Sequence, residues 1–308
     1  MQFLLLLFLF ETQGTAITLE DPFFLAEDLA IHTQFFYILD RSSYAVGKFA
    51  KDGTLLGYTK GRGQGPGEFD KPRSITVNED FVFVSDYRMI HIFDHDLKFL
   101  KKFETINNPR DIVAFGDKLF VSTVEFPGGS ESIYVYRSDG HFVEKFHEHN
   151  SPDNQMVMPF LEIDSSGSLY VQPRIGYGAH KLSETGQSLD LPALKRSGRY
   201  KDFLPYEPFA KKYGSSLATA KKWRVEWSEP DGVAIVQDQY LVLSFKELQR
   251  DLVSNRYYLE SFDLQSGEKV LNWAMAPGKL LHGGDGLYFF IDAEKPMIGR
   301  FDLESLAK

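Results

Sequence analysis

One pattern recurs six times along the chain of 308 residues: an apolar run, a loop, a second apolar run, a tight turn and a third run. Internal repeats constrain a fold strongly, because every copy must adopt the same supersecondary structure. The turns carry Gly, Asp or Asn, as in "KDG", "SDG" and "QSG", and these residues tolerate the positive φ of a hairpin turn. The pattern therefore predicts antiparallel strands. The copies begin near Phe35, Phe81, Lys118, Ser168, Tyr240 and Gly286.

A further short apolar run precedes each copy, so each unit is predicted to have four strands. In five of the six units a proline stands at the start of this first strand, where no hydrogen-bond donor of the sheet is lost. The units average about 48 residues, which is close to the length of a propeller blade. The aromatic share of 15% also favours strands. We therefore predict an all-β fold, a six-bladed β-propeller. The five prolines are Pro72, Pro109, Pro159, Pro230 and Pro277.

The two ends of the chain are predicted to meet in the last blade. The sixth unit stops after its third strand, near Leu303. The segment "AITLEDPFFL", which starts at Ala16, can supply the missing fourth strand and close the ring. Residues 17–308 are thus predicted to form a single propeller domain.

Residues 1–16 resemble a secretory signal peptide. The apolar run from Phe3 to Phe10 is too short to span a bilayer, and Gly14 and Ala16 are small residues suited to a cleavage site. We expect export to the periplasm or the extracellular space. The alternative is that the apolar run forms a buried N-terminal strand.

The stretch "GRGQGPGEF" (61–69) raises the question of a phosphate-binding loop. A Walker loop needs Gly-Lys-[Ser/Thr], but Glu68 follows Gly67, and a predicted strand follows where a dinucleotide fingerprint needs a helix. The glycines are instead predicted to permit a crowded crossover between blades 1 and 2.

The same junction, "GRGQGPGEFDKPRSI", resembles that of NHL-repeat proteins, in which a glycine-rich run followed by Phe, Pro and Ile precedes an inner strand. The resemblance implies a six-bladed propeller with an Asp ending the second strand of each repeat. Asp40 and Asp86 stand at that position, whereas blades 3 to 6 lack both the glycine junction and the Asp. The close resemblance therefore covers blades 1 and 2.

The long connections all follow the second or fourth strand of a blade, and such connections lie on one face of a propeller. We call this the loop face; its long connections fall at 61–71, 125–132, 147–158, 195–230 and 246–255. Loops on a rigid scaffold commonly carry function.

The largest connection, 195–230, is an insertion between blades 4 and 5 with nine Lys or Arg and four Asp or Glu. Its "SSLATAKKW" predicts a short helix with Ser215 as N-cap. Tyr206, Trp223 and Trp227 are candidate residues for binding a ligand or a protein partner. The alternative is a plug whose aromatic side chains pack over blades 4 and 5.

Arginines are predicted at the channel mouth on this face. Arg73 and Arg110 each follow the proline of a first strand, and Arg62, Arg174 and Lys279 are expected nearby. Converging guanidinium groups would bind a carboxylate or a phosphate. The alternative is ion pairing with Asp40, Asp86 and Asp111.

Several function classes lack support in the sequence. The net charge of −9 argues against nucleic-acid binding, the absence of cysteine excludes thiolate chemistry, and no G-x-S-x-G motif occurs. No catalytic residue, metal site or cofactor is predicted, nor any membrane-spanning segment. We expect a monomeric, non-catalytic binding module for a protein partner or a small anionic ligand.

An enzyme is the alternative, because six-bladed propellers of the gluconolactonase and regucalcin type hold a divalent metal in the channel. Glu162, Asp231 and Asp292 are carboxylates near the channel ends, but the Asn-containing ligand set of that family has no match here. This alternative is a metal-dependent hydrolase or lactonase.

Overall fold

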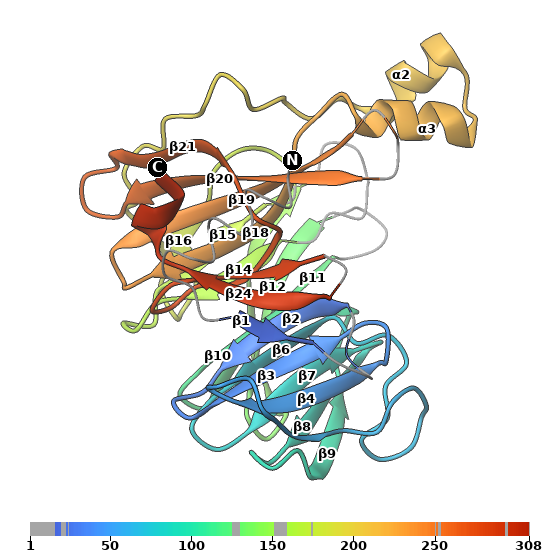
Figure 1. Ribbon diagram of the computed structural model, residues 1–308, viewed down its shortest axis with the longest axis vertical. Coiled ribbons are helices and arrows are strands. Elements are labelled where there is room, and N and C mark those ends of the chain that lie inside the picture. Colours follow the sequence, from blue (N-terminus) through green and yellow to red (C-terminus); the bar gives the residue numbers. More distant parts are fainter. Residues whose placement is uncertain are drawn as a thin grey trace.

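Six four-stranded antiparallel sheets form the protein, as seen in a computed structural model (Figure 1). The first strands of the sheets, β2, β6, β10, β14, β18 and β22, contact one another in sequence, and β22 contacts β2. These contacts close a ring, so the predicted six-bladed propeller is confirmed. The structure describes residues 16–19, 23, 25–124, 130–150, 159–173, 175–249, 251, 254–292 and 295–307.

Each of the first three blades is built from consecutive strands. Blade 1 consists of β2 (Ala26–Ile31), β3 (Phe35–Asp40), β4 (Ala45–Ala50) and β5 (Leu55–Tyr58). Blade 2 consists of β6 (Ser74–Val77), β7 (Val82–Asp86), β8 (Met89–Phe93) and β9 (Phe99–Glu104). Blade 3 consists of β10 (Pro109–Phe115), β11 (Lys118–Val124), β12 (Ser130–Arg137) and β13 (Phe142–Asn150).

Blades 4 and 5 follow the same order, and blade 6 takes one strand from the other end of the chain. Blade 4 consists of β14 (Phe160–Ile163), β15 (Leu169–Gln172), β16 (His180–Leu182) and β17 (Ser188–Leu189). Blade 5 consists of β18 (Glu229–Val236), β19 (Tyr240–Leu248), β20 (Asn255–Asp263) and β21 (Lys269–Met275). Blade 6 consists of β22 (Lys279–His282), β23 (Leu287–Ile291), β24 (Met297–Phe301) and β1 (Ala16–Thr18), and the turn η1 (Leu303–Ala307) follows β24.

The hydrophobic core lies between neighbouring blades. All five residues of β7 are buried, because other blades cover both faces of a middle strand. Between blades 1 and 2, for example, Tyr37 and Leu39 pack with Phe69 and Val84 in one cluster. The repeated apolar runs of the sequence therefore form the hydrophobic core between neighbouring blades.

Strand β1 completes blade 6, as predicted. It pairs antiparallel with β24 in the register Ala16↔Gly299, Ile17↔Ile298 and Thr18↔Met297. Ile17 is 3% exposed and belongs to the cluster that contains Phe36 of blade 1. Ala16, the last residue of the predicted signal peptide, is the first residue of this strand, and residues 1–15 lie outside the described residues.

Shortening the Ile17 side chain is expected to weaken this closure. Ile17→Ala should lower the free energy of unfolding by about 2 kcal/mol, since it removes buried methyl groups from a short strand at the edge of the sheet. Thr18→Ala, at an exposed position of the same strand, is the control and should change it by less than about 0.5 kcal/mol. Urea unfolding followed by circular dichroism measures both. Equal effects of the two substitutions would show that β1 is not part of the cooperative fold.

The glycine-rich junction wraps around one glutamate. A Cβ atom added to Gly63 would lie 2.0 Å from Glu68 Oε2, and the amide of Gly65 donates to that oxygen at 2.9 Å. Phe69 then enters the core, where it is fully buried against His91 and Phe93. The glycines therefore leave room for a folded-back acidic side chain, and the chain continues into strand β6.

The insertion carries two helices, α2 (Tyr206–Tyr213) and α3 (Leu217–Arg224). The sequence predicted α3 but not α2. The N-cap of α3 is Ser216, whose Oγ accepts from the amide of Thr219 at 3.1 Å, so the prediction of Ser215 was wrong by one residue. Pro208 is tolerated in the first turn of α2, where a backbone N–H has no partner in the helix.

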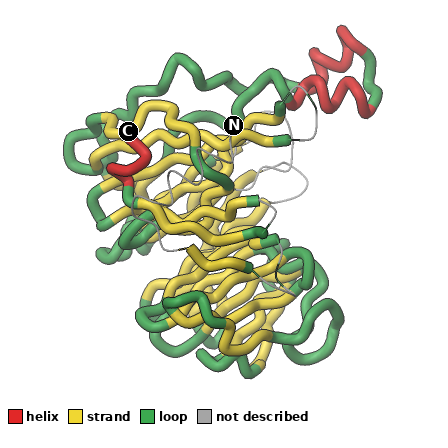
Figure 2. The backbone as a smooth tube through the Cα atoms, viewed as in Figure 1, coloured by secondary structure: helices red, strands yellow, loops and turns green. Residues whose placement is uncertain are grey.

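Both helices stand apart from the sheets at one corner of the molecule (Figures 1 and 2). None of the helices in the described ranges has the length and apolar character of a bilayer-spanning segment.

Candidate functional site

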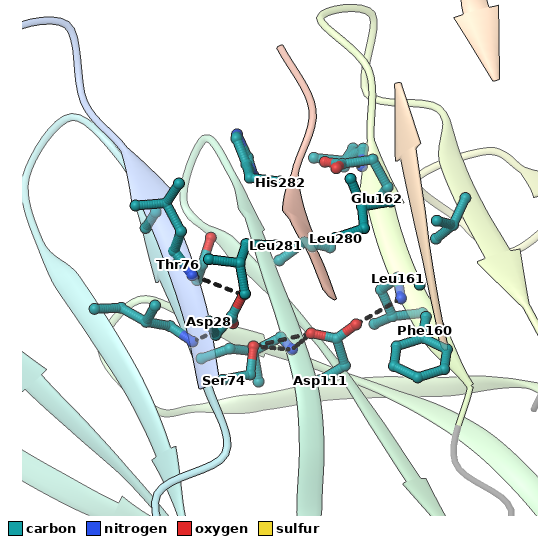
Figure 3. Close-up of a pocket in the computed structure, with 18 of the residues that line it drawn as sticks. Asp28, Ser74, Thr76, Asp111, Phe160, Leu161, Glu162, Leu280, Leu281 and His282 are labelled. Carbon is teal, nitrogen blue, oxygen red and sulfur yellow. Dashed lines mark hydrogen bonds between the residues drawn. The ribbon is translucent and has the colours of Figure 1, made fainter. Parts of the chain in front are cut away.

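A cavity of about 650 Å³ runs along the propeller axis. Residues of all six first strands, β2, β6, β10, β14, β18 and β22, line it (Figure 3). Its volume lies within the range of pockets that bind small molecules. The cavity is therefore the candidate functional site.

The mouth of the cavity on the loop face is rich in charge. Each first strand begins at this face, so the residues near its start surround the opening. Arg73 of blade 2 and Arg110 of blade 3 line the cavity side by side in blade order, as predicted from their place after a proline. Glu27, Asp231 and Lys279 line it on blades 1, 5 and 6.

Local ion pairs neutralise the other half of the mouth. The ammonium of Lys279 donates to the backbone oxygen of Glu27 at 2.6 Å and lies 3.7 Å from its carboxylate. Asp231 accepts from Lys246 at 2.8 Å. The guanidinium of Arg73 makes no ion pair with any residue in the described ranges. Arg73 therefore leaves a positive charge at the blade 2 side of the mouth.

Two of the carboxylates expected to pair with these arginines, Asp40 and Asp86, accept hydrogen bonds from backbone amides. Asp40 accepts the amides of Leu25, at 2.5 Å, and of Ser42 and Ser43. Asp86 accepts the amides of Asp70 and Lys71, at 2.9 and 2.5 Å. In both cases a carboxylate at the end of the second strand of a blade fixes the chain that leads into or out of the blade.

Of the remaining predicted binding residues, none that the structure describes lines the cavity. Arg62 does not line the cavity; its guanidinium carbon lies 5.2 Å from the centre of the Tyr44 ring. Arg174 lies outside the described residues. Tyr206, Trp223 and Trp227 belong to the insertion and lie away from the channel.

The three aromatic residues of the insertion form a packed cluster. Trp223 and Trp227 are 7% and 5% exposed, and their ring centroids lie 5.4 Å apart. Tyr206 packs edge-on against Trp223 at 5.2 Å, and Trp223 Nε1 donates to the backbone oxygen of Leu204. The cluster fixes the two helices to the base of the insertion.

Two aspartates inside the channel connect neighbouring blades. Asp28 of blade 1 accepts the amide of Ile75 of blade 2 at 2.8 Å. Asp111 of blade 3 accepts the amide of Leu161 of blade 4 at 2.7 Å and the hydroxyl of Ser74 of blade 2 at 2.9 Å (Figure 3). Their hydrogen bonds hold blades 1 to 4 together around the cavity.

Removal from bulk solvent sets the protonation of these two acids. Both side chains touch the cavity but are otherwise surrounded by the ring. This burial raises the pKa of Asp28 to about 7, with a further contribution from the charge of Asp111. It raises the pKa of Asp111 to about 6, although the amide of Leu161 and the hydroxyl of Ser74 oppose the rise.

Glu162 and His282 are two further titratable groups of the channel, on blades 4 and 6 (Figure 3). Burial raises the pKa of Glu162 to about 8, and the charges of Asp111 and Asp28 add to the rise. Burial lowers the pKa of His282 to about 4. At neutral pH Glu162 is thus a neutral hydrogen-bond donor and His282 is an uncharged imidazole.

Sequence reasoning pointed to Arg73, Arg110, Lys279 and Glu162 but missed Asp28 and His282. A signal for Asp28 exists in the aligned repeats. Directly after the mouth residue, the first three blades carry a short polar residue, namely Asp28, Ser74 and Asp111, whereas blades 4 to 6 carry Leu161, Gly232 and Leu280. Within the described part of the chain, no three acidic or histidine side chains gather closely enough to hold a metal ion.

Comparison with known proteins supports the fold. No model of a known family matches the chain, and no curated protein matches its sequence. Among solved structures, a Bacteroides fragilis protein named "Putative exported protein" matches with a TM-score of 0.66 and 11% identity over 94% of this chain and 93% of that one. A member of the DUF4221 family from Bacteroides vulgatus matches with a TM-score of 0.62 and 9% identity over 94% and 96%.

A luciferin-regenerating enzyme matches with a TM-score of 0.55 and 14% identity over 94% of this chain and 95% of that one. Likeness at such low identity shows the propeller fold alone, because propellers support many functions. The NHL resemblance of blades 1 and 2 stays a prediction.

Proposed function

We propose that the protein is an exported binding module that takes a small anionic ligand, a carboxylate or a phosphate, into the mouth of its channel on the loop face. The observation that carries the proposal is the arginine pair Arg73 and Arg110 on neighbouring blades of one cavity. Arg73 makes no ion pair with the described residues, while Lys279 and Asp231 are paired. A guanidinium at a partly enclosed mouth is suited to bidentate binding of a carboxylate or phosphate. Export agrees with the name of one structural neighbour.

The interior of the channel offers an anion one neutral hydrogen-bond donor, Glu162. Ionised carboxylates below the arginines would repel the anion. Burial instead keeps Glu162 protonated at neutral pH, so it can donate a hydrogen bond to the ligand. His282 is uncharged as well, whereas Asp111, with a pKa of about 6, is largely ionised at neutral pH, so we expect the anion to bind at the arginines of the mouth rather than beside the aspartates.

A thermal-shift screen with sugar acids, phosphorylated sugars and dicarboxylates tests this proposal. A ligand that binds only the folded protein raises the melting temperature by mass action. Arg73→Ala should weaken the binding of the best ligand by about tenfold to a hundredfold, because a charge-assisted hydrogen bond contributes about 1.5–3 kcal/mol. Isothermal titration calorimetry measures the loss.

The matched control is Arg137→Ala, an exposed arginine at the end of β12, which lies on the face opposite the loop face and outside the cavity lining. It should bind the ligand like the wild type. If no anion binds, or if both variants bind equally well, the proposal is wrong.

A second candidate is an enzyme that uses acid–base chemistry in the channel, such as the metal-dependent hydrolase or lactonase predicted as the alternative. The observation in its favour is the group of carboxyls whose pKa values lie near neutrality within one cavity: Asp28, Asp111 and Glu162. Its test is turnover of a panel of lactones and esters with and without divalent ions. Activity that Glu162→Gln abolishes while anion binding persists would favour the enzyme over the binding module.

A further inference from the structure

The two-helix arm of the insertion carries a groove of its own. The groove has a volume of about 780 Å³ and shares no lining residue with the channel. Helix α2 has no buried residue, and α3 buries only Thr219 and Trp223. The apolar part of the lining is Leu204, Pro208, Phe209, Tyr213 and Val225.

Several apolar side chains remain uncovered on this arm. Tyr213 is 56% exposed and Leu217 is 77% exposed, while Leu204 on the groove wall is 37% exposed. Helices of eight residues gain little stability on their own, so the arm depends on the aromatic cluster at its base. A concave apolar surface that is exposed to solvent is typical of an interaction site.

The charge on the groove indicates what it binds. Lys212 and Lys222 line it, and neither forms an ion pair with the described residues, in contrast to Lys211, which pairs with Glu207 at 2.9 Å. The insertion 195–230 has a net charge of +5 in a protein whose net charge is −9. Because the arm stands apart from the ring and salt screens charges beyond about 8 Å, an acidic partner can approach it with little repulsion from the rest of the protein.

We propose that this groove binds a short acidic peptide segment of a protein partner, in which Asp or Glu flanks apolar side chains. The apolar side chains would contact Phe209 and Tyr213, and the carboxylates would pair with Lys212 and Lys222. The concave lining, which also contains Glu226, fits a peptide better than it fits the flat anionic surface of a membrane.

The test is panning of a random dodecapeptide display library on the full-length protein. Enriched peptides should carry Asp or Glu around apolar residues. Fluorescence anisotropy should show that the enriched peptides bind the double variant Lys212→Glu/Lys222→Glu at least tenfold more weakly than the wild type. Their binding to the wild type should weaken as the salt concentration rises. The matched control Lys60→Glu/Lys98→Glu makes the same charge change at exposed lysines of blades 1 and 2 and should bind normally.

Three results would overturn the proposal. One is a library that enriches no acidic peptide, or peptides that bind the double variant as well as the wild type. Another is that the wild type binds no peptide but sediments with phosphatidylserine vesicles, and that the double variant does not sediment with them. The last is a dimer in analytical ultracentrifugation that the double variant dissociates, since the occupant would then be a second copy of the chain. Circular dichroism of both variants separates loss of binding from loss of fold.

Discussion

Asp86→Ala is expected to lower the free energy of unfolding by about 3–5 kcal/mol. The carboxylate accepts the amides of Asp70 at 2.9 Å, Lys71 at 2.5 Å and Tyr87 at 2.8 Å, and it is 5% exposed. Removing it leaves several backbone donors without their partner, and each such buried group costs about 1–3 kcal/mol. The substitution should loosen the junction that places Phe69 in the core.

Urea unfolding of Asp86→Ala beside Asp80→Ala measures this effect. Asp80 is an exposed carboxylate in the same blade, so its replacement should change stability by less than about 0.5 kcal/mol. A second, independent readout is the pH dependence. Burial alone would raise the pKa of Asp86, but the hydrogen bonds from His91 and from the amides of Asp70 and Lys71 outweigh it and lower the pKa.

A carboxyl whose pKa is lower in the folded than in the unfolded protein stabilises the fold above its unfolded pKa of about 3.9. This stabilisation is lost as the pH falls through the lower, folded value. The difference between wild type and Asp86→Ala should therefore stay constant from pH 5 to pH 7 and shrink below about pH 4. A difference that grew on acidification would contradict the assigned role.

Glu162→Gln is expected to make the protein more stable at pH 8.5 and to have little effect at pH 5. The pKa of Glu162 rises to about 8 in the folded protein because of burial and the nearby acids. Between the unfolded value, about 4.3, and the folded value, the unfolded chain binds fewer protons than the folded one, so stability falls as the pH rises. Gln cannot ionise and avoids this loss.

At pH 8.5 the substitution should raise the free energy of unfolding by about 2–4 kcal/mol, a range that allows for the contact of Glu162 with solvent in the cavity. Melting temperatures of the wild type, Glu162→Gln and the exposed control Glu79→Gln from pH 5 to pH 9 measure it. If Glu162→Gln and the wild type lose stability in parallel as the pH rises, Glu162 is already ionised in the folded protein and cannot donate a hydrogen bond to an anion.

The repeat pattern allowed the fold to be predicted because every blade carries the same physical requirements. Strand turns need Gly, Asp or Asn, and the space between blades needs apolar residues. The count of strands after the last turn was enough to predict that β1 would complete blade 6. The prediction of the mouth arginines relied on the same regularity, since Arg73 and Arg110 occupy equivalent places in two repeats.

The details that sequence reasoning missed depend on single contacts. Helix α2 contains a proline and ends at a glycine, and its support comes from Trp223, which lies on α3. Asp28 and His282 matter because they line the cavity along the propeller axis; alignment of the repeats gives a signal for Asp28 but none for His282. Arg62 lies within the crowded glycine junction, and its guanidinium is turned toward the Tyr44 ring.

The pairing of β1 with β24 also has a consequence for how the chain folds. Ala16 and Gly299 are at opposite ends of the sequence, so this contact has nearly the largest sequence separation that the chain allows. Contacts of that kind form late and slowly, because a very long loop must close first. During synthesis, blades 1 to 5 can assemble before the C-terminal strands of blade 6 have been made. Until β24 is made, the backbone N–H and C=O groups of β1 have no sheet partner. A chaperone or another nascent chain could pair with this strand during that time.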